Sequence, residues 1–456
     1  MRSVFGQNII VTLEGESHGP RVKCRAVGVP AGISVDAKGL EAFMSRRRGG
    51  QRGTTPRREA DVPEFLSGLS DSVTDGAELV ISIPNQNTRS GDYAGLTDTP
   101  RPSHADYTAP IRFPGCDMRG GGHFSARLTA PLCALGYICK CALAERGIRI
   151  GAHLRSVGDV ADDPFDPVKV SASDFVGPDQ FPARNSLAAE LMQKRIDEAA
   201  AEGDSVGGVV ECAVIGCPAG IGSPLAAGIE NRVSEAMFIL GGLRGIEFGS
   251  GFEASEMRGS VHNDPFVIRE GRVATETNNS GGVQAGITNG MPVIFRCAFK
   301  PTASISRPQK TVSLSGMKGT EILLRGRHDP CIAVRAVACV EALTAIVVLD
   351  AMLDRPGETL EECRREIDVI NDRLTELLCR RLEVAGRIAD IKKSMGHPIL
   401  DAVREGAILE RVRDLADERE PGTGSAVAEI FHGIMRVTRE HERARTDADG
   451  SAPEEV

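Results

Sequence analysis

Apolar positions divide the chain into a long first part of short apolar runs and a last part of periodic helices. Runs at residues 9–13, 27–29, 77–83 and 292–299 are bounded by glycine or proline and predict strands. Longer runs rich in alanine and leucine predict helices over 37–47, 128–145, 185–202, 229–238 and 332–353. This mixture favours an α+β fold with layered sheets over a regular alternation of strands and helices.

The pattern changes after residue 353, where glycine becomes scarce and charges become dense. Apolar residues then recur every three or four positions and predict a long amphipathic helix over 360–395, about 50 Å in length. Gly396 and Pro398 end it, and shorter helices are expected over 401–418 and 425–445. We therefore expect a first domain at 1–353, a linker at 354–362, a helical domain at 363–445 and a disordered acidic tail at 446–456.

The composition indicates a globular protein and argues against membrane, nucleic-acid and metal partners. The 456 residues are 41% hydrophobic and 26% charged, which is ordinary for a globular protein. The start of the chain lacks a signal-peptide pattern and no run of 18 apolar residues occurs, so we expect a cytoplasmic protein without a membrane partner. The net charge of -9 and the absence of tryptophan argue against a nucleic-acid partner. Twelve scattered cysteines, of which Cys139 and Cys141 are closest, predict reduced thiols and no metal site.

The densest chemistry lies in residues 101–127, RPSHADYTAPIRFPGCDMRGGGHFSAR. His104 and Asp106 precede the triplet Gly120–Gly122, and four arginines surround them. Adjacent glycines let the main chain approach a flat or anionic ligand, and arginines donate to phosphate or carboxylate. The alternative is a glycine-rich surface loop beside a solvated basic strip.

Further polar stretches have the same character. Residues 46–58 hold six arginines among glycines, which predicts a flexible anion-gripping loop. Asp329 stands before the helix expected at 332–353, where it is either part of an anion site or an N-cap. No GxGxxG follows a strand, and no GxxxxGK[ST] occurs, so neither a dinucleotide-binding nor a P-loop site is supported.

Seven motifs in order, GESHGP, RRRGG, RPSHADY, RGGGHFSAR, NNSGG, KPTASI and GRHDPC, resemble chorismate synthase over roughly residues 1–353. The resemblance implies a β-α-β sandwich assembled as a homotetramer. It also implies anti-1,4-elimination of phosphate from 5-enolpyruvylshikimate 3-phosphate to give chorismate. The family uses reduced FMN that is not consumed overall, and NADPH is a candidate reductant.

The resemblance also assigns roles to residues of the first domain. His18 and His104 act as acids, one at the flavin and the other near the leaving phosphate. Asp329 takes a proton at the flavin, and Ser17 and Ser125 hydrogen-bond within that network. The implied substrate contacts are Arg48, Arg101, Arg127 and Arg327, with Arg47 and Arg52 nearby at the entrance. The implied cofactor contacts are Arg47, Arg52, His123, Phe124, Ser125, Gly241, Gly242, Ala285, Lys300, Pro301, Thr302, Ala303, Ser304 and Arg327.

Two departures from the family affect the expected cofactor contacts. An arginine-serine pair common in the family is His123-Phe124 here, and an asparagine-alanine pair is Gly241-Gly242. Ser125 and Arg127 are kept. We therefore expect altered flavin affinity with the chemistry retained.

In the last part, Arg381 interrupts the apolar seam of the long helix, and Arg364 and Lys392 flank it. Buried cations need counterions, which suggests an anion bound between helices; an oligomerisation coiled coil that tolerates one arginine is the alternative. The three helices resemble all-helical chorismate mutase across about 364–443. In that family the long first helix is shared across a dimer.

This second resemblance implies a substrate site for chorismate, in which Arg381, Lys392 and Glu442 are catalytic. The implied contacts are Arg364, Arg381, Lys392, Asp401, Arg404, Glu405, Thr438 and Glu442. Thr438 replaces the usual serine and Glu442 the usual glutamine. Glu442 must be protonated to donate a hydrogen bond to the ether oxygen, so we expect mutase activity to fall as the pH rises.

The product of the first reaction is the substrate of the second, so we expect one bifunctional enzyme that makes chorismate and then prephenate. A second hypothesis keeps the first enzyme and makes the helical domain a non-catalytic dimerisation or regulatory module. A third, a flavin oxidoreductase with net hydride transfer, lacks a nicotinamide-binding signature.

Overall fold

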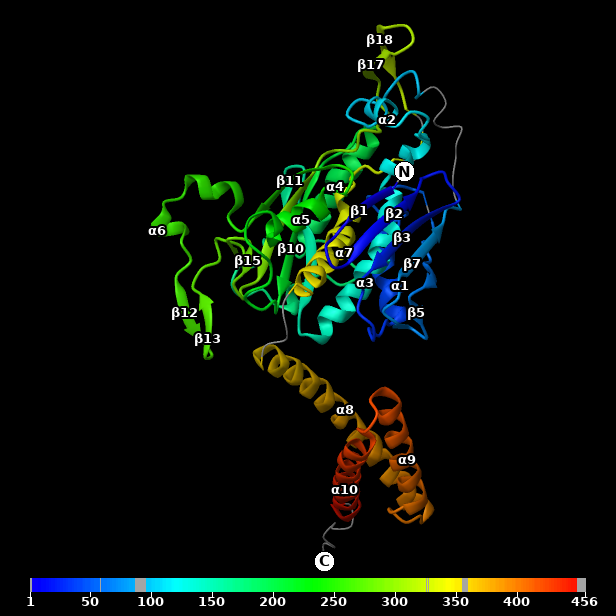
Figure 1. Ribbon diagram of the computed structural model, residues 1–456, viewed down its shortest axis with the longest axis vertical. Coiled ribbons are helices and arrows are strands. Elements are labelled where there is room, and N and C mark those ends of the chain that lie inside the picture. The colour runs from blue at the N-terminus through cyan, green and yellow to red at the C-terminus, as the bar shows by residue number, and fades with distance from the viewer. Residues whose placement is uncertain are drawn as a thin grey trace, which may run out of the picture. The chain divides into compact units, whose positions relative to one another are not determined.

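Two five-stranded antiparallel sheets form layers of the first of two units, Met1–Arg365, in a computed structural model of the chain (Figure 1). The structure describes residues 2–57, 59–86, 96–324, 326, 328–354 and 360–448. The first sheet has the order β1-β2-β3-β7-β4, with strands Arg2–Phe5, Ile10–Gly15, Arg21–Val27, Leu79–Pro84 and Glu64–Ser67. The second has the order β11-β16-β10-β8-β9, with strands Leu243–Phe248, Val293–Phe299, Gly208–Ile215, Arg149–Val157 and Val160–Ala161.

Helices α3 (Thr129–Glu145) and α7 (Ala333–Met352) form the layer between the sheets. α3 packs on β3 and β7 of the first sheet and on β8 of the second, and α7 packs on β8 and β10. Every residue of α7 from 336 to 351 is buried, as expected of a mostly apolar helix, and its two buried carboxylates, Glu341 and Asp350, are paired with cations. The segment Ala126–Glu145 is long and apolar enough to cross a membrane, but it is mostly buried inside this unit. The two helices approach closely because Gly136 lies against Ala342, where an added Cβ would be 2.4 Å from Cα.

Smaller elements complete the first unit. α1 (Ala37–Arg47) packs on α3 and α7, and it begins at Asp36, whose carboxylate accepts hydrogen bonds from the N–H groups of Lys38 and Gly39. The remaining helices are α2 (Thr108–Arg112), α4 (Ser186–Ala201), α5 (Ile229–Met237) and α6 (Gly259–His262). The two-stranded pairs are β5 (Leu69–Ser70) with β6 (Val73–Thr74), β12 (Phe266–Arg269) with β13 (Arg272–Thr275), β14 (Val283–Gln284) with β15 (Ile287–Thr288), and β17 (Gln309–Ser313) with β18 (Lys318–Ile322).

A polar cluster is buried at the second sheet. The ring of His153 on β8 is fully buried, with Nδ1 3.1 Å from the carboxylate of Asp162 and Nε2 3.0 Å from that of Glu211 on β10. Burial lowers the pKa of His153, but the hydrogen bonds to Asp162 and Glu211 outweigh it and raise the pKa above its ordinary value. Asp162 also accepts hydrogen bonds from the N–H groups of Arg184 and Asn185. The cluster therefore ties the segment before α4 to the sheet.

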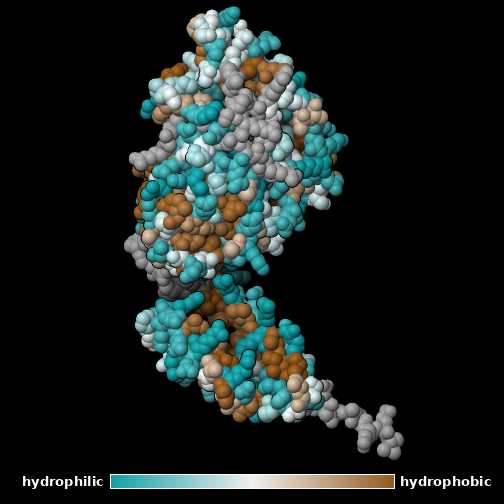
Figure 2. Space-filling model, turned by 90° about the vertical axis from the view of Figure 1, so that its right-hand side faces the viewer, coloured by the Kyte–Doolittle hydropathy of each residue, from teal (hydrophilic) through white to brown (hydrophobic). Residues whose placement is uncertain are grey.

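The second unit, Glu366–Val456, is helical. Its helices are α8 (Leu360–Met395), α9 (Ala402–Arg419) and α10 (Gly424–Ala448), and α9 packs against α10. Much of the apolar seam of α8 remains on the surface, where hydrophobic residues are visible in Figure 2. Ile370, Leu374, Leu377 and Ile391 are between 48 and 62% exposed. Within the part of the chain that the structure describes, this face of α8 is therefore only partly covered.

The predicted helices are confirmed to within one to three residues at their ends, and so is the α+β class. One strand was predicted wrongly: the apolar run at 27–29 is not its centre, because β3 runs from Arg21 to Val27. In β3, Val22, Cys24 and Ala26 are buried, while the intervening basic residues are only partly so. This alternation, rather than a continuous apolar run, is the signal of a strand buried on one face.

Candidate functional site

Four of the predicted site residues of the first unit lie against the glycine triplet at residues 120–122. Its φ angles are 62, 86 and 53°, a region that glycine adopts readily. A Cβ added at Gly120 would lie 2.7 Å from the ring of His18 and 2.7 Å from Oγ of Ser17. Ser17 is fully buried, and its Oγ has no hydrogen-bond partner among the described residues. Because buried hydroxyls are nearly always hydrogen-bonded, this one fits a site in which a bound molecule supplies the partner.

The next glycine lies against a second pair of predicted residues. A Cβ added at Gly121 would lie 3.7 Å from Nε2 of His104 and 3.6 Å from Cβ of Ser125. The other ring nitrogen of His104, Nδ1, is 2.7 Å from the carboxylate of Asp106. Because Nδ1 is engaged by that carboxylate, Nε2 is the ring nitrogen of His104 that lies near the glycines. The triplet therefore brings His18, His104, Ser17 and Ser125 to one place.

Asp106 also holds Arg101, whose Nε is 2.6 Å from the carboxylate. Arg101 donates a further hydrogen bond of 3.0 Å to Oγ of Ser304. Burial of Asp106 opposes ionisation, but the hydrogen bonds from Arg101 and His104 hold its pKa well below the usual range. The charged carboxylate of Asp106 thus orients His104, a predicted acid, and Arg101, a predicted substrate contact.

Arg47 and Arg127 share a buried carboxylate, Asp61. Arg47 lies 2.5 Å from Oδ2 of Asp61 and donates to Oγ1 of Thr129, while Arg127 pairs with the other carboxylate oxygen and donates to Asn85. The pKa of Asp61 is lowered, because these two guanidinium groups outweigh the effect of burial. The expected position of Arg47 at an entrance is wrong, since only 2% of this residue is exposed. Sequence reasoning missed Asp61, which no local motif marks.

A small cavity of about 50 Å³ adjoins Arg47. Asp329, Arg335 and Gly241 line it together with Arg47. Asp329 accepts a 2.8 Å hydrogen bond from the N–H of Thr55 and is 2.9 Å from Arg335. It is not the N-cap of α7, which begins after Ile332 without a side-chain cap.

The loop at residues 300–304 contacts Gly242 and Ser103 through Lys300. The N–H of Lys300 donates to the carbonyl of Gly242, and its Nζ lies 2.5 Å from the carbonyl of Ser103. Oγ1 of Thr302 is buried and, like Ser17, has no partner among the described residues. Pro301, Ala303 and Ser304 belong to the same loop. At Gly242 an added Cβ would lie 2.4 Å from Cδ1 of Ile332, so the departure to glycine fits the local packing of this chain.

Further residues predicted to contact the cofactor are His123, Phe124, Ala285 and Arg327. His123 directs both ring nitrogens to the first sheet, with Nδ1 2.8 Å from the carbonyl of Gly15 and Nε2 3.1 Å from Oγ of Ser3. Both ring nitrogens of His123 are therefore engaged within the chain. Phe124 is 40% exposed, with its ring centroid 6.5 Å from that of Phe113. Ala285 is an exposed residue of the turn between β14 and β15, and Arg327 lies outside the described residues.

The arginine-rich segment at 46–58 is not a free anion-gripping loop. Its charges are paired within the chain: Arg46 with Glu341, Arg47 with Asp61, Arg48 with Glu41, Arg52 with Asp197 and Arg57 with Glu59. Arg58 lies outside the described residues. Arg48 differs in one respect, because its Nε is buried without a partner in the described part of the chain.

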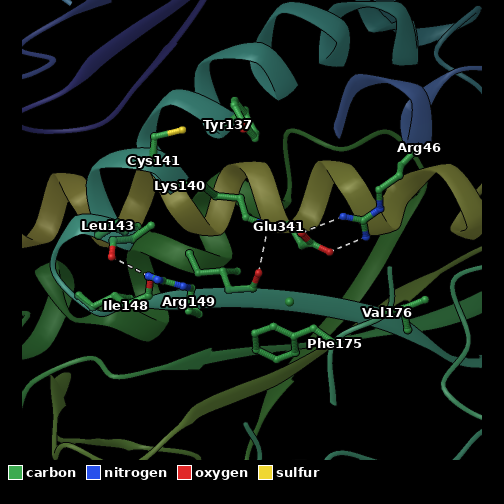
Figure 3. Close-up of a pocket in the computed structure, with 13 residues that line it drawn as sticks. Arg46, Tyr137, Lys140, Cys141, Leu143, Ile148, Arg149, Phe175, Val176 and Glu341 are labelled. Carbon is green, nitrogen blue, oxygen red and sulfur yellow. Dashed lines mark hydrogen bonds and ion pairs between the residues drawn. The ribbon is translucent and has the colours of Figure 1, made fainter. Parts of the chain in front are cut away.

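A larger cavity of about 330 Å³ contains none of the predicted site residues. Figure 3 shows Arg46 and Glu341 pointing toward one another beside it. Glu341 is buried on α7 and pairs with Arg46 of α1 and Lys140 of α3. Burial raises the pKa of Glu341, but these two cations outweigh it and lower the pKa to about 2. The cluster ties three helices together, and we assign the cavity no role in catalysis.

In the second unit, the seam residue Arg381 donates a hydrogen bond to the hydroxyl of Thr438 on α10. Glu442 lies one turn further along α10 and is buried like Thr438. Nζ of Lys392 donates to the carbonyl of Ile399. Three predicted residues, Arg381, Thr438 and Glu442, are thus brought to the same face between α8 and α10.

The remaining predicted residues of this unit lie on and beside α9. Asp401 caps α9 by accepting from the N–H of Arg404, and Glu405 pairs with Arg439 of α10. Sequence reasoning missed Arg439. Arg364 is exposed on α8. Among the described residues, no group of histidine, cysteine, aspartate or glutamate side chains is arranged to hold a metal ion.

Comparison with known proteins identifies both parts. The family model for chorismate synthase matches residues 9–353, and that for chorismate mutase type II matches residues 363–443. The chorismate synthase of Thermococcus gammatolerans is 45% identical over 77% of this chain and 97% of that relative. The chorismate synthase of Opitutus terrae is 43% identical over 77% and 96%, respectively.

A solved structure described as "Crystal Structure of Chorismate Synthase" is 27% identical, with a TM-score of 0.61, and the match covers 82% of this chain and all of the other. It supports the sandwich of two sheets around α3 and α7. The chain therefore belongs to the chorismate synthase family and carries a chorismate mutase type II domain at its C-terminal end, as a bifunctional enzyme of aromatic biosynthesis.

Proposed function

We propose that the first unit eliminates phosphate from 5-enolpyruvylshikimate 3-phosphate at the glycine triplet, and that the second rearranges the resulting chorismate to prephenate. The observation that carries the first assignment is the meeting of Ser17, His18, His104 and Ser125 at Gly120 and Gly121. Two histidines near one backbone segment can hold or deliver protons near neutral pH. Arg47 and Arg127 share the single carboxylate of Asp61, so this pair retains a net positive charge that favours an anionic substrate.

Reduced FMN fits the residues present around the triplet. The buried hydroxyls of Ser17 and Thr302 have no partner in the described chain, and a side chain at Gly120 would collide with His18 and Ser17. A flat ring with polar edges could supply the missing hydrogen bonds to these hydroxyls. When bound, the reduced flavin would supply electrons transiently, and NADPH is the proposed reductant. The contacts would come from Ser17, Ser125 and the loop at 300–304, without the side chain of His123.

The chain's own groups would act as follows. His104, with Nδ1 at Asp106, would present Nε2 as a proton donor, and His18 would act as the second acid beside Ser17. Asp329 would accept a proton, and Arg335 beside it would stabilise its charged form. Arg48, whose Nε lacks a partner in the described chain, is proposed to contact the substrate anions, while Asp106 and Asp61 orient Arg101 and Arg127.

At the second site, the Claisen rearrangement of chorismate needs no nucleophile. Arg381 and Lys392 would clamp the substrate's carboxylates in the compact conformer, which lowers the barrier by positioning. Protonated Glu442, together with Arg381, would stabilise the negative charge that develops on the ether oxygen. The observation that carries this assignment is the contact of Arg381 with Thr438 one turn from Glu442. Arg364, Asp401, Arg404 and Glu405 would complete the substrate contacts.

The exposed seam of α8 supports an oligomer. An unpaired apolar helix face of this length is normally covered by another helix. We propose that a second copy of the chain covers it, within a homotetramer. We further propose domain limits of 1–353 and 363–445, a linker at 354–362, and a cytoplasmic location.

The proposed function is tested by anaerobic incubation of the full chain with 5-enolpyruvylshikimate 3-phosphate and reduced FMN. Phosphate, chorismate and prephenate are followed together. Prephenate is expected to appear in step with phosphate. Chorismate that accumulates without prephenate would instead support a non-catalytic helical module, and absence of phosphate release would contradict the first assignment.

A further inference from the structure

Two thiols that the proposed reactions do not use lie side by side, and one of them lines the small cavity. Cys133 of α3 and Cys339 of α7 are both buried, and their Sγ atoms are 3.8 Å apart. Three residues further along each helix, Gly136 and Ala342 are in close contact. A disulfide needs Cα atoms about 4.4–6.8 Å apart, and the contact of Gly136 with Ala342 holds the two helices close together beside the two cysteines.

Cys339 is the more reactive member of the pair. The hydrogen bond from Cys133 lowers the pKa of Cys339, and the charges of Arg47 and Arg335 act in the same direction against burial. The thiolate, not the thiol, is the nucleophile in reactions with oxidants. Burial raises the pKa values of Cys24, Cys139 and Cys212, and no cation in the described part of the chain reverses that effect. Cys339 therefore differs from these other buried thiols.

Access also distinguishes the two sulfurs. Cys339 lines the cavity of about 50 Å³, whereas Cys133 is fully buried behind it. A space of this size admits a molecule comparable to water. Hydrogen peroxide is small enough to enter, but a tripeptide disulfide such as oxidised glutathione is not.

We propose that hydrogen peroxide oxidises Cys339 and that Cys133 resolves the product, giving a reversible disulfide between α3 and α7. The Cys339 thiolate attacks one peroxide oxygen, the O–O bond breaks, and the departing hydroxide takes a proton to become water, which leaves a sulfenic acid. The sulfur of Cys133 then displaces hydroxide from that sulfenic acid and gives it a proton. The S–S bond forms with a second water, so one peroxide accepts the two electrons that the two thiols lose.

The bond would act on the neighbouring site, a consequence that rests on the proposed function. Oxidation would remove the ionisable thiol of Cys339 from beside Arg47 and Arg335. Both arginines contact carboxylates of the site, Asp61 and Asp329, respectively. A disulfide would therefore change the charge and shape of the cavity wall and lower the rate of chorismate formation.

The test treats the full chain with hydrogen peroxide, blocks the remaining thiols, digests without reduction and measures the peptides by mass spectrometry. The expected product is the peptide of Cys133 joined to that of Cys339, two hydrogen atoms lighter than their sum. Dithiothreitol should separate it, Cys339→Ser and Cys133→Ser should abolish it, and oxidised glutathione should not produce it. Cys139→Ser, which removes another buried thiol of α3, is the matched control and should leave it unchanged.

The peptide measurement does not depend on either enzyme activity, so it separates failure of this inference from failure of the proposed function. Unlinked Cys133 and Cys339 in a sample where the exposed Cys379 is oxidised would overturn the proposal. Where the link forms, chorismate formation should fall at least about tenfold and recover with dithiothreitol, while conversion of added chorismate to prephenate stays constant. If the linked protein forms chorismate at an unchanged rate, the proposal that the disulfide controls the site is wrong.

Discussion

The guanidinium of Arg381 on α8 donates a hydrogen bond to the hydroxyl of Thr438 on α10, which places a cation from the apolar seam against a polar face of another helix. Part of the seam thus makes a polar contact between helices and does not only pack apolar side chains. This contact distinguishes the proposed mutase site from a simple coiled coil, in which an arginine on the seam would have to turn to solvent.

Arg381→Ala should reduce conversion of chorismate to prephenate at least about 100-fold, because a positioned cation in a closed site stabilises developing charge strongly. Release of phosphate from 5-enolpyruvylshikimate 3-phosphate should stay within about twofold. The neighbouring Arg380 is exposed, and Arg380→Ala serves as the control with near-normal activity. Equal losses in the two variants would argue against a specific role for Arg381.

Glu442→Gln should make mutase activity less dependent on pH. In the native chain the carboxyl must be protonated to donate a hydrogen bond, so the rate falls as the pH rises, whereas an amide donates at any pH. Rates of prephenate formation from added chorismate between pH 5 and 9 test this. Parallel pH profiles for the native chain and the variant would contradict it.

Gly120→Ala should impair the first reaction alone. The added Cβ would lie 2.7 Å from His18 and Ser17, and the residue has a φ of 62°, which costs alanine about 1–2 kcal/mol. Chorismate formation should fall at least about tenfold, while added chorismate is still converted to prephenate. Gly115→Ala is a matched control, because Gly115 has a φ of 78° and an added Cβ there meets nothing within 4 Å. Similar effects of both changes would point to backbone strain and not to the site.

The layers of the fold followed from the apolar pattern, because α3 and α7 are mostly apolar and are therefore expected to be largely buried. The meeting of His18 with His104 could be expected only through family motifs, since these residues approach each other at a glycine triplet remote in sequence from His18. Asp61 and Arg439 were missed for the same reason. Asp61 pairs with Arg127, and Arg439 pairs with Glu405, and the members of each pair are far apart in the sequence. Arg47 shows the opposite error, because a basic run looks solvent-exposed until a distant carboxylate is known to neutralise it.

His153 should make the second sheet less stable at alkaline pH. Its pKa is raised in the folded chain, so its stabilising contribution is fully present below the unfolded value of about 6.5 and is lost as the pH rises through the folded pKa. Hydrogen exchange of the β8 and β10 peptides, corrected for the intrinsic effect of pH, should show a lower opening free energy at pH 9 than at pH 6.

His153→Gln should remove most of this difference, whereas His397→Gln, a change at an exposed histidine, should preserve it. An opening free energy in the native chain that does not change between these pH values would show that the His153 cluster contributes no pH-dependent stability.

The central claim, that one chain carries two separate sites acting in sequence, is tested most directly by mixing two variants that each lack one activity. Gly120→Ala and Arg381→Ala are incubated anaerobically, alone and together, with 5-enolpyruvylshikimate 3-phosphate and reduced FMN, and prephenate is measured. Each variant alone should form little prephenate, and the mixture should form it readily, because chorismate released by one variant is used by the other. A mixture that releases phosphate and accumulates chorismate without prephenate would contradict the claim.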